Sequence, residues 1–215
     1  MKLKPLSKIY VLYGPPASGK KTLANLLYKF GVERVVSHTT RLRRPYERDG
    51  IDYFFTDKTN FYHNELFERI VYDGNFFGIS QPILTSKLKT GKPVVLVMNK
   101  KGLIKMKNLF KNRVVSIYVM STRQQIIDRI MKRDETLEFA ESRIDYYYKN
   151  NDPDEWKDAD FVIKNSNHLN SSLMQILTIM NLTVLDKIKL ATKKKKKNLL
   201  LNKTTRPTMT KWYAP

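Results

Sequence analysis

The sequence predicts an α/β fold built around a central parallel sheet. Residues 8–13 are a short run of β-branched and aromatic side chains that leads into a glycine-rich loop, and residues 22–30 follow with apolar side chains at helical spacing. Residues 93–98 and 114–120 are unbroken apolar runs, which are typical of strands covered on both faces. Because such strands alternate with helical segments, we expect βαβ units and a three-layer arrangement with helices on both sides of the sheet.

The segment between the first helix and the next long strand is expected to be mixed. Residues 35–56 are typical of short strands and turns, residues 59–70 are predicted to be helical, and residues 76–80 are predicted to be extended. A further helix is predicted from Ser80, whose hydroxyl can cap it, to Gly91, with a proline in its first turn.

The second half of the chain continues the alternation of helices and strands. Its expected elements are a helix around 102–110, a helix over 122–132 capped by Ser121, a helix over 137–150, a short strand at 161–163 and a closing amphipathic helix over 169–190. With 215 residues, the chain has the length of a single domain. We expect residues 1–190 to form this domain and residues 191–215 to be a basic low-complexity tail.

The charge is strongly positive and unevenly distributed. The chain carries 40 Lys and Arg against 20 Asp and Glu, a net charge of +20, and the stretch from Lys187 to Pro215 has ten basic side chains and no acidic one. Such a tail suits a nucleic acid or another polyanion, with Trp212 and Tyr213 stacking on bases. A disordered solubilising end is the alternative, and the codon usage of an AT-rich genome is the alternative explanation for the basic body.

Composition also excludes several classes of protein. The chain contains no cysteine, which excludes a disulfide framework and a thiolate nucleophile or metal site. It has no uncharged apolar run of roughly 18 residues, so no membrane span is expected, and its first apolar stretch lacks the features of a signal peptide. We therefore expect a cytoplasmic location. Neither composition nor motifs indicate an oligomeric state.

The first chemical motif reads GPPASGKKT, from Gly14 to Thr22. Its spacing is that of a P-loop, in which backbone N–H groups and the following helix N-terminus hold phosphates and a lysine, here Lys20, reaches the terminal ones. The next position normally carries a hydroxyl that binds Mg²⁺, but Lys21 stands there, so we expect Thr22 to take over the metal role. The expected contacts to the nucleotide phosphates are Gly14, Ser18, Gly19, Lys20, Lys21 and Thr22.

Two further segments indicate the family. They are SHTTRLRRP at residues 37–45, followed by GIDYFF at residues 50–55, and GNFFGIS at residues 74–80. They closely resemble the SHTTR-x-x-R, G-x-D-Y-x-F and GNYYG segments of the guanylate kinase family, and the similarity extends over about residues 8–180. The resemblance implies a P-loop NTPase fold with ATP and GMP as substrates.

The same resemblance implies a small GMP-binding lobe over about residues 35–90. The family's GMP-binding residues correspond here to Ser37, Arg41, Arg44, Tyr53, Glu68, Phe77 and Ser80. The chemistry of these side chains agrees with the assignment, because Arg41 and Arg44 can converge on one phosphate with the Tyr53 hydroxyl as a further donor. The Glu68 carboxylate can accept hydrogen bonds from N1–H and the amine of guanine, and Ser37 can complete the recognition of the base.

The chain departs from the family pattern at several positions. Phe77 stands where the family has the second tyrosine of GNYYG, so one phosphate-binding hydroxyl is missing. Val97 and Asn99 stand where the family has two aspartates, the second of which helps to arrange nucleotide and Mg²⁺. His38, inside the SHTTR segment, is interpreted as a solvated loop histidine.

A helical lid is implied over about residues 122–150. Arg129, Arg133 and Arg143 resemble the arginines that close over ATP and the transferred phosphoryl group, and Asn165 resembles the asparagine beside the adenine. Phosphoryl transfer depends on alignment and on neutralising the charge of the equatorial oxygens. The expected catalytic residues are Lys20, Arg41, Arg129, Arg133 and Arg143.

The sequence thus predicts a guanylate kinase, which transfers the γ-phosphoryl group of ATP to GMP and gives GDP and ADP. Mg²⁺ is expected to arrive with ATP and to be held mainly by phosphate oxygens and waters. The alternative is a catalytically weak or inactive binding module of the same fold, attached to a nucleic-acid or protein assembly through its basic surface and tail. The lost aspartates, Lys21 and Phe77 favour the module, whereas the retained lid arginines and the guanine-reading pair favour the enzyme.

Overall fold

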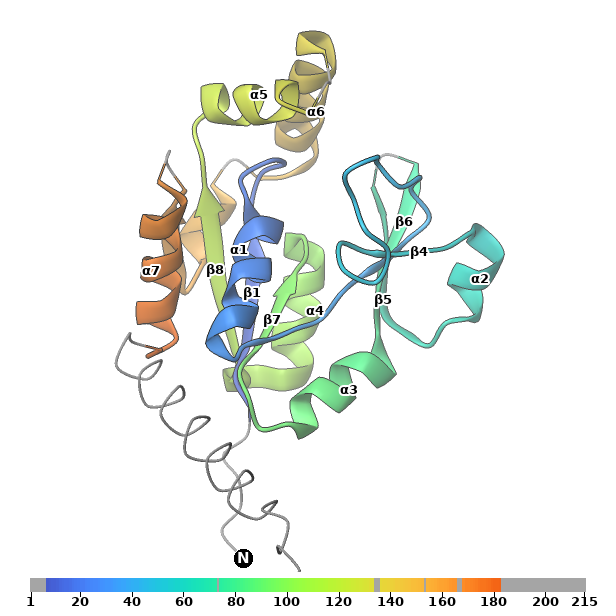
Figure 1. Cartoon of the computed structure of the whole chain (residues 1–215), viewed down its shortest axis with the longest axis vertical. Helices are drawn as coiled ribbons and strands as arrows, with labels where there is room; N and C mark the ends of the chain where they lie inside the picture. Colours follow the sequence, from blue (N-terminus) through green and yellow to red (C-terminus); the bar gives the residue numbers. More distant parts are fainter. Residues whose placement is uncertain (1–6, 73, 134–135, 153, 166–167, 183–215) are drawn as a thin grey trace, which may run out of the picture. The chain divides into compact units, whose positions relative to one another are not determined.

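The computed structural model of the chain describes residues 7–72, 74–133, 136–152, 154–165 and 168–182. The chain divides into two compact units, residues 1–176 and residues 177–215. The central sheet of the first unit is parallel and has the strand order β2-β7-β1-β8-β9. Its strands are β1 (Ile9–Tyr13), β2 (Glu33–Arg34), β7 (Val94–Val97), β8 (Val114–Met120) and β9 (Phe161–Lys164). The predicted parallel sheet is confirmed (Figure 1).

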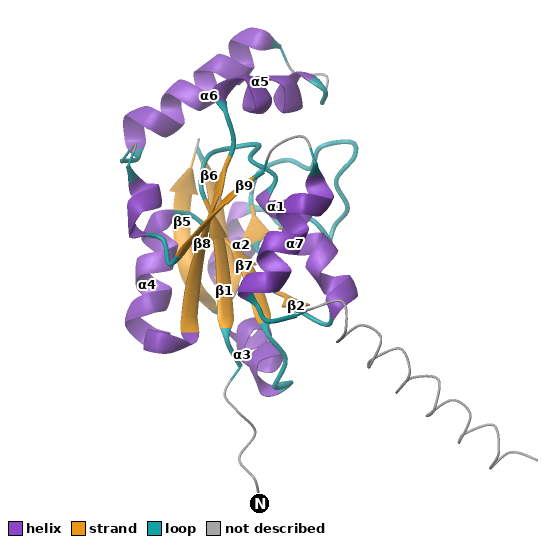
Figure 2. Ribbon diagram, turned by 90° about the vertical axis from the view of Figure 1, so that its left-hand side faces the viewer, coloured by secondary structure: helices purple, strands orange, loops and turns teal. Residues whose placement is uncertain are grey.

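Helices cover both faces of this sheet (Figure 2). Helix α4 (Lys100–Phe110) lies on one face, and α1 (Lys20–Leu27) lies on the other. The central strands β1 and β7 are apolar and almost wholly buried because they receive side chains from both layers. The main core cluster joins β1, β7 and β8 to the buried face of α4.

A second sheet forms a small lobe beside the central one, with the strand order β4-β3-β6-β5. Its elements are β3 (His38–Thr39), β4 (Phe54–Phe55), α2 (Lys58–His63), β5 (Leu66–Tyr72) and β6 (Asn75–Ser80), and α3 (Gln81–Lys89) leads back to the central sheet. The Ser80 hydroxyl accepts a hydrogen bond from the backbone N–H of Ile83, which confirms the predicted cap of α3.

The helix predicted over residues 59–70 is wrong in its second half. Helix α2 ends at His63, and residues 66–72 form β5, which pairs antiparallel with β6. The sequence of β5, LFERIVY, has apolar residues that satisfy a helical period as well as an alternating one over so short a run. Its aromatic and β-branched side chains favour the strand once β6 is available as a partner.

The lid consists of α5 (Arg123–Met131) and α6 (Leu137–Asn150), which pack through a cluster of buried isoleucines and Ala140. The cap of α5 is Thr122 and not Ser121, because Thr122 and Gln125 form a reciprocal capping box. Ser121 is buried, and its hydroxyl donates to the backbone of Asn165. The residues between the lid and β9 include a short 3₁₀ helix at Glu155–Asp158.

Helix α7 (Leu169–Ile179) ends earlier than the predicted 169–190, and Asn181 beyond it has a left-handed backbone conformation. Residues 183–190 and the predicted tail at 191–215 lie outside the described residues. Within the described ranges, none of the helices is long and apolar enough to span a membrane.

Candidate functional site

A cavity of about 460 Å³ lies where the P-loop, the small lobe and the lid face one another. Many of the predicted site residues line it, namely Gly14, Gly19, Lys20, Lys21, Thr22, Ser37, Arg41, Arg44, Tyr53, Glu68, Phe77, Arg133 and Arg143. Four predicted site residues are not among its lining residues, namely Ser18, Ser80, Arg129 and Asn165. Residues from three distant parts of the sequence therefore meet in one space.

The P-loop lies between the buried end of β1 and the first turn of α1. Gly14 has a φ of 126°, and a Cβ atom there would approach the carbonyl oxygen of Val119 to 2.9 Å, so this turn requires glycine. The Lys20 ammonium folds back onto the loop and donates to the carbonyl oxygens of Gly14 at 2.9 Å and Pro15 at 2.6 Å. Burial lowers the pKa of Lys20 to about 7. An anion in this loop would therefore stabilise the charged form of Lys20.

Lys21 points away from the P-loop towards the small lobe. Its ammonium donates to Oε1 of Glu47 at 3.0 Å, lies 3.6 Å from Oδ1 of Asp52, and sits 4.0 Å from the ring centre of Tyr53. All three partners belong to the lobe. Burial lowers the pKa of Lys21, and the hydrogen bond with Glu47 opposes this effect.

Glu47 is the buried centre of the arginine-rich loop. Its carboxylate accepts from Nη2 of Arg41 at 2.7 and 2.8 Å and from the backbone N–H of Arg44 at 3.1 Å. Burial by itself would raise the pKa of Glu47, but the hydrogen bonds from Arg41, Lys21 and the Arg44 backbone lower it to about 2. The carboxylate is therefore ionised at neutral pH and holds Arg41 against the cavity wall.

Glu68 lies on β5 with only 3% of its surface exposed, and burial raises its pKa to about 7. Its carboxyl group packs directly on Gly102 in the first turn of α4, where a Cβ atom would overlap both carboxyl oxygens. Asn99 caps α4 by accepting from the Gly102 backbone N–H at 2.9 Å. Asn99, which stands in place of the family's aspartate, therefore stabilises the N-terminus of α4 at the edge of the cavity.

Two of the residues predicted to bind GMP, Phe77 and Ser80, have different surroundings. Phe77 lines the cavity and packs edge-on against Tyr53, with ring centres 5.9 Å apart. Ser80 is buried and uses its hydroxyl to cap α3.

His38 is not a solvated loop residue: it lies in β3, is 9% exposed and stacks on Phe54. It is buried because β3 is an inner strand of the lobe sheet, between β4 and β6.

The lid arginines fall into two groups. Arg133 and Arg143 line the cavity. Arg129 instead donates to the carbonyl oxygens of Ala17 at 3.3 Å and Asn165 at 2.8 Å and to the Ser121 hydroxyl at 2.9 Å. It therefore fastens α5 to the backbone of the P-loop.

Asn165 follows β9 and is 3% exposed. Its side-chain amide donates to the carbonyl oxygen of Ser18 at 2.6 Å and accepts from the Ser172 hydroxyl at 2.9 Å. Ser18, itself a P-loop residue, is fully buried. Asn165 therefore holds the P-loop backbone at Ser18, next to Gly19.

Sequence reasoning missed several residues that line or shape the cavity. Glu47 and Asp52 lie in or between the segments SHTTRLRRP and GIDYFF and had no assigned role, although a carboxylate among arginines is itself a sign of a shared ionic network. Gly102 carries no such sign. Glu155 is 2% exposed and accepts from the Tyr147 hydroxyl, and its second carboxyl oxygen is buried without a partner among the described residues.

The structure also bears on Mg²⁺. Among the described residues, no three His, Asp or Glu side chains come together as metal ligands. Thr22 is exposed and lines the cavity, whereas Asn99 is engaged as a helix cap. These surroundings fit a metal ion that is carried mainly by nucleotide phosphates and waters, with Thr22 as the available hydroxyl.

Comparisons with known proteins agree with this geometry. A family model described as guanylate kinase matches residues 6–182. The guanylate kinase of Bartonella henselae is 30% identical over 179 residues, which cover 80% of this chain and 79% of that protein. The guanylate kinase of Anaplasma phagocytophilum is 32% identical over 151 residues, 66% of this chain and 72% of that protein.

A solved structure gives the same result. The crystal structure of guanylate kinase from Anaplasma phagocytophilum matches with a TM-score of 0.62 and 28% identity, covering 83% of this chain and 87% of that chain. The fold is therefore that of a P-loop NTPase with a central parallel sheet. Because the family model spans the P-loop, the small lobe and the lid, the chain belongs to the guanylate kinase family.

Proposed function

We propose that this chain is an active guanylate kinase that transfers the γ-phosphoryl group of ATP to GMP, and that it acts in the cytoplasm. The observation that carries the proposal is that the P-loop lysine, the arginines of the small lobe, Glu68 and two lid arginines line one shared cavity. Donor and acceptor phosphates that enter it from opposite sides would meet inside one space, as in-line transfer requires.

The acceptor half of the cavity suits GMP. Arg41 and Arg44 would bind its phosphate together with the Tyr53 hydroxyl, because guanidinium groups match phosphate oxygens in pairs. Glu68 in its ionised form would accept from N1–H and the exocyclic amine of guanine, and Ser37 would bind the same base. AMP presents an acceptor at N1, so it would face Glu68 with the wrong polarity.

The donor half suits ATP. The P-loop with Gly14, Gly19 and Lys20 would bind the phosphates, and Lys20 would exchange its two carbonyl partners for phosphate oxygens. Arg133 and Arg143 would neutralise charge on the transferring group, while Arg129 would position the lid on the P-loop. Ser18 and Asn165 would act by supporting the loop, and Ser80 by fixing the end of β6.

No side-chain base is required, because the attacking oxygen already belongs to a phosphate anion. Mg²⁺ bound to ATP would supply further charge neutralisation and would fix the geometry of the phosphates. We propose Thr22 as the residue that contacts it, since position 21 carries an ammonium group. The chain's own contribution is then alignment, charge neutralisation by cations and exclusion of water.

A coupled assay of ADP release with GMP and Mg-ATP tests the proposal. We expect GMP-dependent ADP release that AMP, CMP and UMP do not support at equal concentration. A protein that binds GMP but releases no ADP would support the alternative, a binding module of the same fold. The curated relatives reported above are named as enzymes, and they favour the active form.

We further propose a polyanion, such as RNA, as a partner for the basic stretch from Lys187 to Pro215. The support is its charge of ten basic and no acidic side chains. Each phosphate that such a stretch neutralises releases counterions, so the binding would depend strongly on salt.

A further inference from the structure

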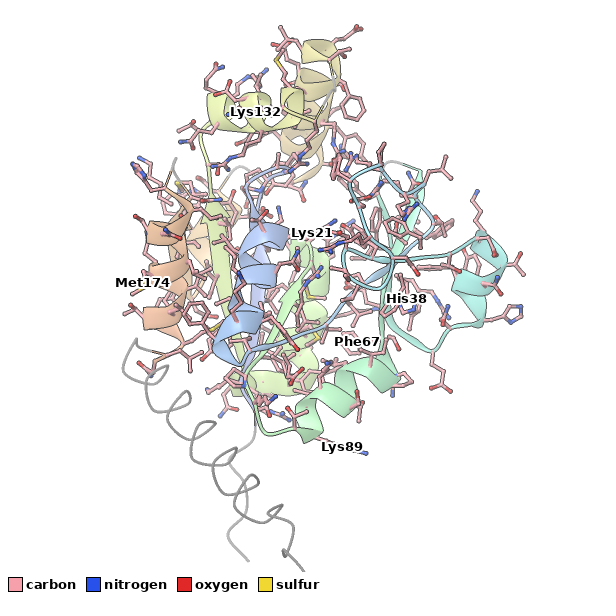
Figure 3. All side chains as sticks on the ribbon, in the orientation of Figure 1. Lys21, His38, Phe67, Lys89, Lys132 and Met174 are labelled. Carbon is pink, nitrogen blue, oxygen red and sulfur yellow. The ribbon has the colours of Figure 1, made fainter. Side chains whose placement is uncertain are left out.

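Lys21 occupies the position at which a P-loop normally offers a hydroxyl to the metal, but its ammonium group contacts residues of the small lobe. In Figure 3 the side chain leaves α1 towards the loops of the small lobe. Its contacts are Glu47 at 3.0 Å, Asp52 at 3.6 Å and the ring of Tyr53 at 4.0 Å. These are the neighbours of the proposed acceptor-phosphate site rather than of the P-loop phosphates.

The charge of this region depends on Lys21. Four cations meet two carboxylates in this region, which leaves two net positive charges before a substrate binds; the cations are Lys21, Arg34, Arg41 and Arg44, and the carboxylates are Glu47 and Asp52. Without Lys21 the same group of side chains would carry one net positive charge. A phosphate dianion is therefore attracted more strongly when Lys21 is present.

Lys21 is also free to exchange its partners at low cost. Glu47 keeps two hydrogen bonds from Arg41 and one from the Arg44 backbone, so its buried carboxylate stays paired when Lys21 leaves. Asp52 is partly exposed, and the Lys21 side chain itself is 29% exposed. An ammonium on a flexible four-carbon stem can therefore turn to a phosphate oxygen beside Arg41 without leaving a buried charge unpaired.

A helix N-terminus is an unfavourable place for a cation, because the backbone N–H groups already supply positive charge there. Lys21 stands in the first turn of α1 and avoids this conflict by extending away from the helix axis to the lobe carboxylates. The positive end of α1 repels the Lys21 ammonium group and the lobe carboxylates attract it, and both effects favour the observed direction of the side chain.

We propose that Lys21 is a third cation of the acceptor-phosphate site, which binds the phosphate of GMP together with Arg41 and Arg44. This inference rests on the proposed function. It assigns Lys21 to the binding of GMP and not to the binding of Mg²⁺. The replacement of the P-loop hydroxyl by lysine removes a possible metal ligand, whereas the added positive charge strengthens the binding of the GMP phosphate.

The test is calorimetric binding of GMP to the full chain without ATP or Mg²⁺. The variants are Lys21→Met, Lys21→Arg and the matched control Lys89→Met, which removes an exposed lysine at the end of α3. We expect Lys21→Met to weaken GMP binding about ten-fold or more, which is the scale of one charge-assisted contact. Guanosine, which lacks the phosphate, should bind Lys21→Met and the wild type alike, and this also shows that the variant is folded. Lys21→Arg should restore most of the affinity for GMP, and Lys89→Met should bind as the wild type does.

Three outcomes would overturn the inference. Lys21→Met could bind GMP as tightly as the wild type, or it could lose guanosine and GMP binding equally. In the third, a further variant, Lys21→Ser, would raise kcat in the coupled assay with KM for GMP unchanged, which would assign position 21 to the binding of the metal. A wild-type protein that neither binds GMP nor phosphorylates it would overturn the proposed function itself, a result that is distinct from a failure of Lys21 alone.

Discussion

The Glu68 carboxyl is 3% exposed, and burial raises its pKa from 4.5 to about 7. Between these two pH values the folded protein binds more protons at Glu68 than the unfolded chain does. The free energy of unfolding therefore falls as the pH rises through this range, and above pH 7 the buried charge costs at most roughly 3 kcal/mol. The charge of Lys105 offsets part of this cost, and a guanine base that donates hydrogen bonds to the carboxylate would offset more of it.

Replacing Glu68 with glutamine separates the two effects. We expect Glu68→Gln to stabilise the free protein, with a gain about 2 kcal/mol larger at pH 8 than at pH 5.5, because the amide never carries a charge. GMP binding should weaken by about 1–3 kcal/mol, since an amide oxygen and amine cannot both accept from guanine. Denaturant unfolding at the two pH values and calorimetry with GMP and AMP provide the measurements.

The exposed Glu65 provides the matched control, because Glu65→Gln removes a carboxylate three residues earlier in the chain. It should change neither the pH dependence of unfolding nor the affinity for GMP. An equal gain at both pH values for Glu68→Gln would show that burial does not set the titration of Glu68. Unchanged preference for GMP over AMP would remove Glu68 from the recognition of the base.

At the scale of elements, Arg129 of α5 joins the lid to the P-loop by hydrogen bonds, beside the packing of Ala17 against the isoleucine cluster of the lid. Arg129 bonds to the Ala17 and Asn165 carbonyl oxygens, and Asn165 in turn donates to the carbonyl of Ser18. The loop backbone between β1 and α1 is thus held by groups that follow β8 and β9. Arg133 and Arg143 line the cavity.

This division predicts different effects for two arginines of the lid. We expect Arg129→Met to lower the free energy of unfolding by about 2 kcal/mol, because hydrogen bonds from a charged group are lost and buried carbonyl oxygens are left without it. Arg133→Met should leave stability nearly unchanged and lower kcat by about 10³-fold, the scale of an arginine that stabilises a transferring phosphoryl group. Denaturant unfolding and the coupled assay give the two quantities.

Arg123 offers a control on the same helix. It is 51% exposed and pairs with Asp145 at 3.2 Å, so Arg123→Met should cost less than about 1 kcal/mol and leave kcat unchanged. If Arg133→Met destabilised the fold while Arg129→Met left it intact, the assignment of the two roles would have to be exchanged.

On the scale of the whole molecule, the net charge of +20 is the dominant property. Half of this excess lies in the stretch from Lys187 to Pro215, which falls outside the described residues. The apolar core described above lies in residues before this stretch. Folding of the catalytic unit and attraction of a polyanion are therefore expected to be separable.

Cutting the chain after Leu190 tests this separation. We expect the shortened chain to fold and to bind GMP as the full chain does, but to bind a short RNA more weakly and with a shallower salt dependence. The physical reason is that fewer phosphates are neutralised and fewer counterions are released. RNA titrations of both forms at two salt concentrations measure the difference. Identical RNA binding would exclude the tail as an anchor, and unfolding of the shortened chain would mean that residues after 190 belong to the core.

The sequence determined the features that rest on local signals. The P-loop spacing, the buried strands β1, β7 and β8, and the cap of α3 by Ser80 follow from contiguous residues, and the structure has them as predicted. The family resemblance predicted that Arg41 and Glu68 belong to one site, and in the structure both line the same cavity. Local patterns are reliable here because buried parallel strands and glycine turns leave few conformations open to the chain.

Only the tertiary structure decided what depends on a partner from elsewhere in the chain. Residues 66–72 became a strand because β6 lies beside them, and His38 became buried because its strand is an inner one. The directions of Lys21 and Arg129 were likewise set across space, by Glu47 in one case and by P-loop carbonyl oxygens in the other. A long cationic side chain reaches several places with similar backbone energy, so the choice among them is made by the charges and acceptors that the fold brings within reach.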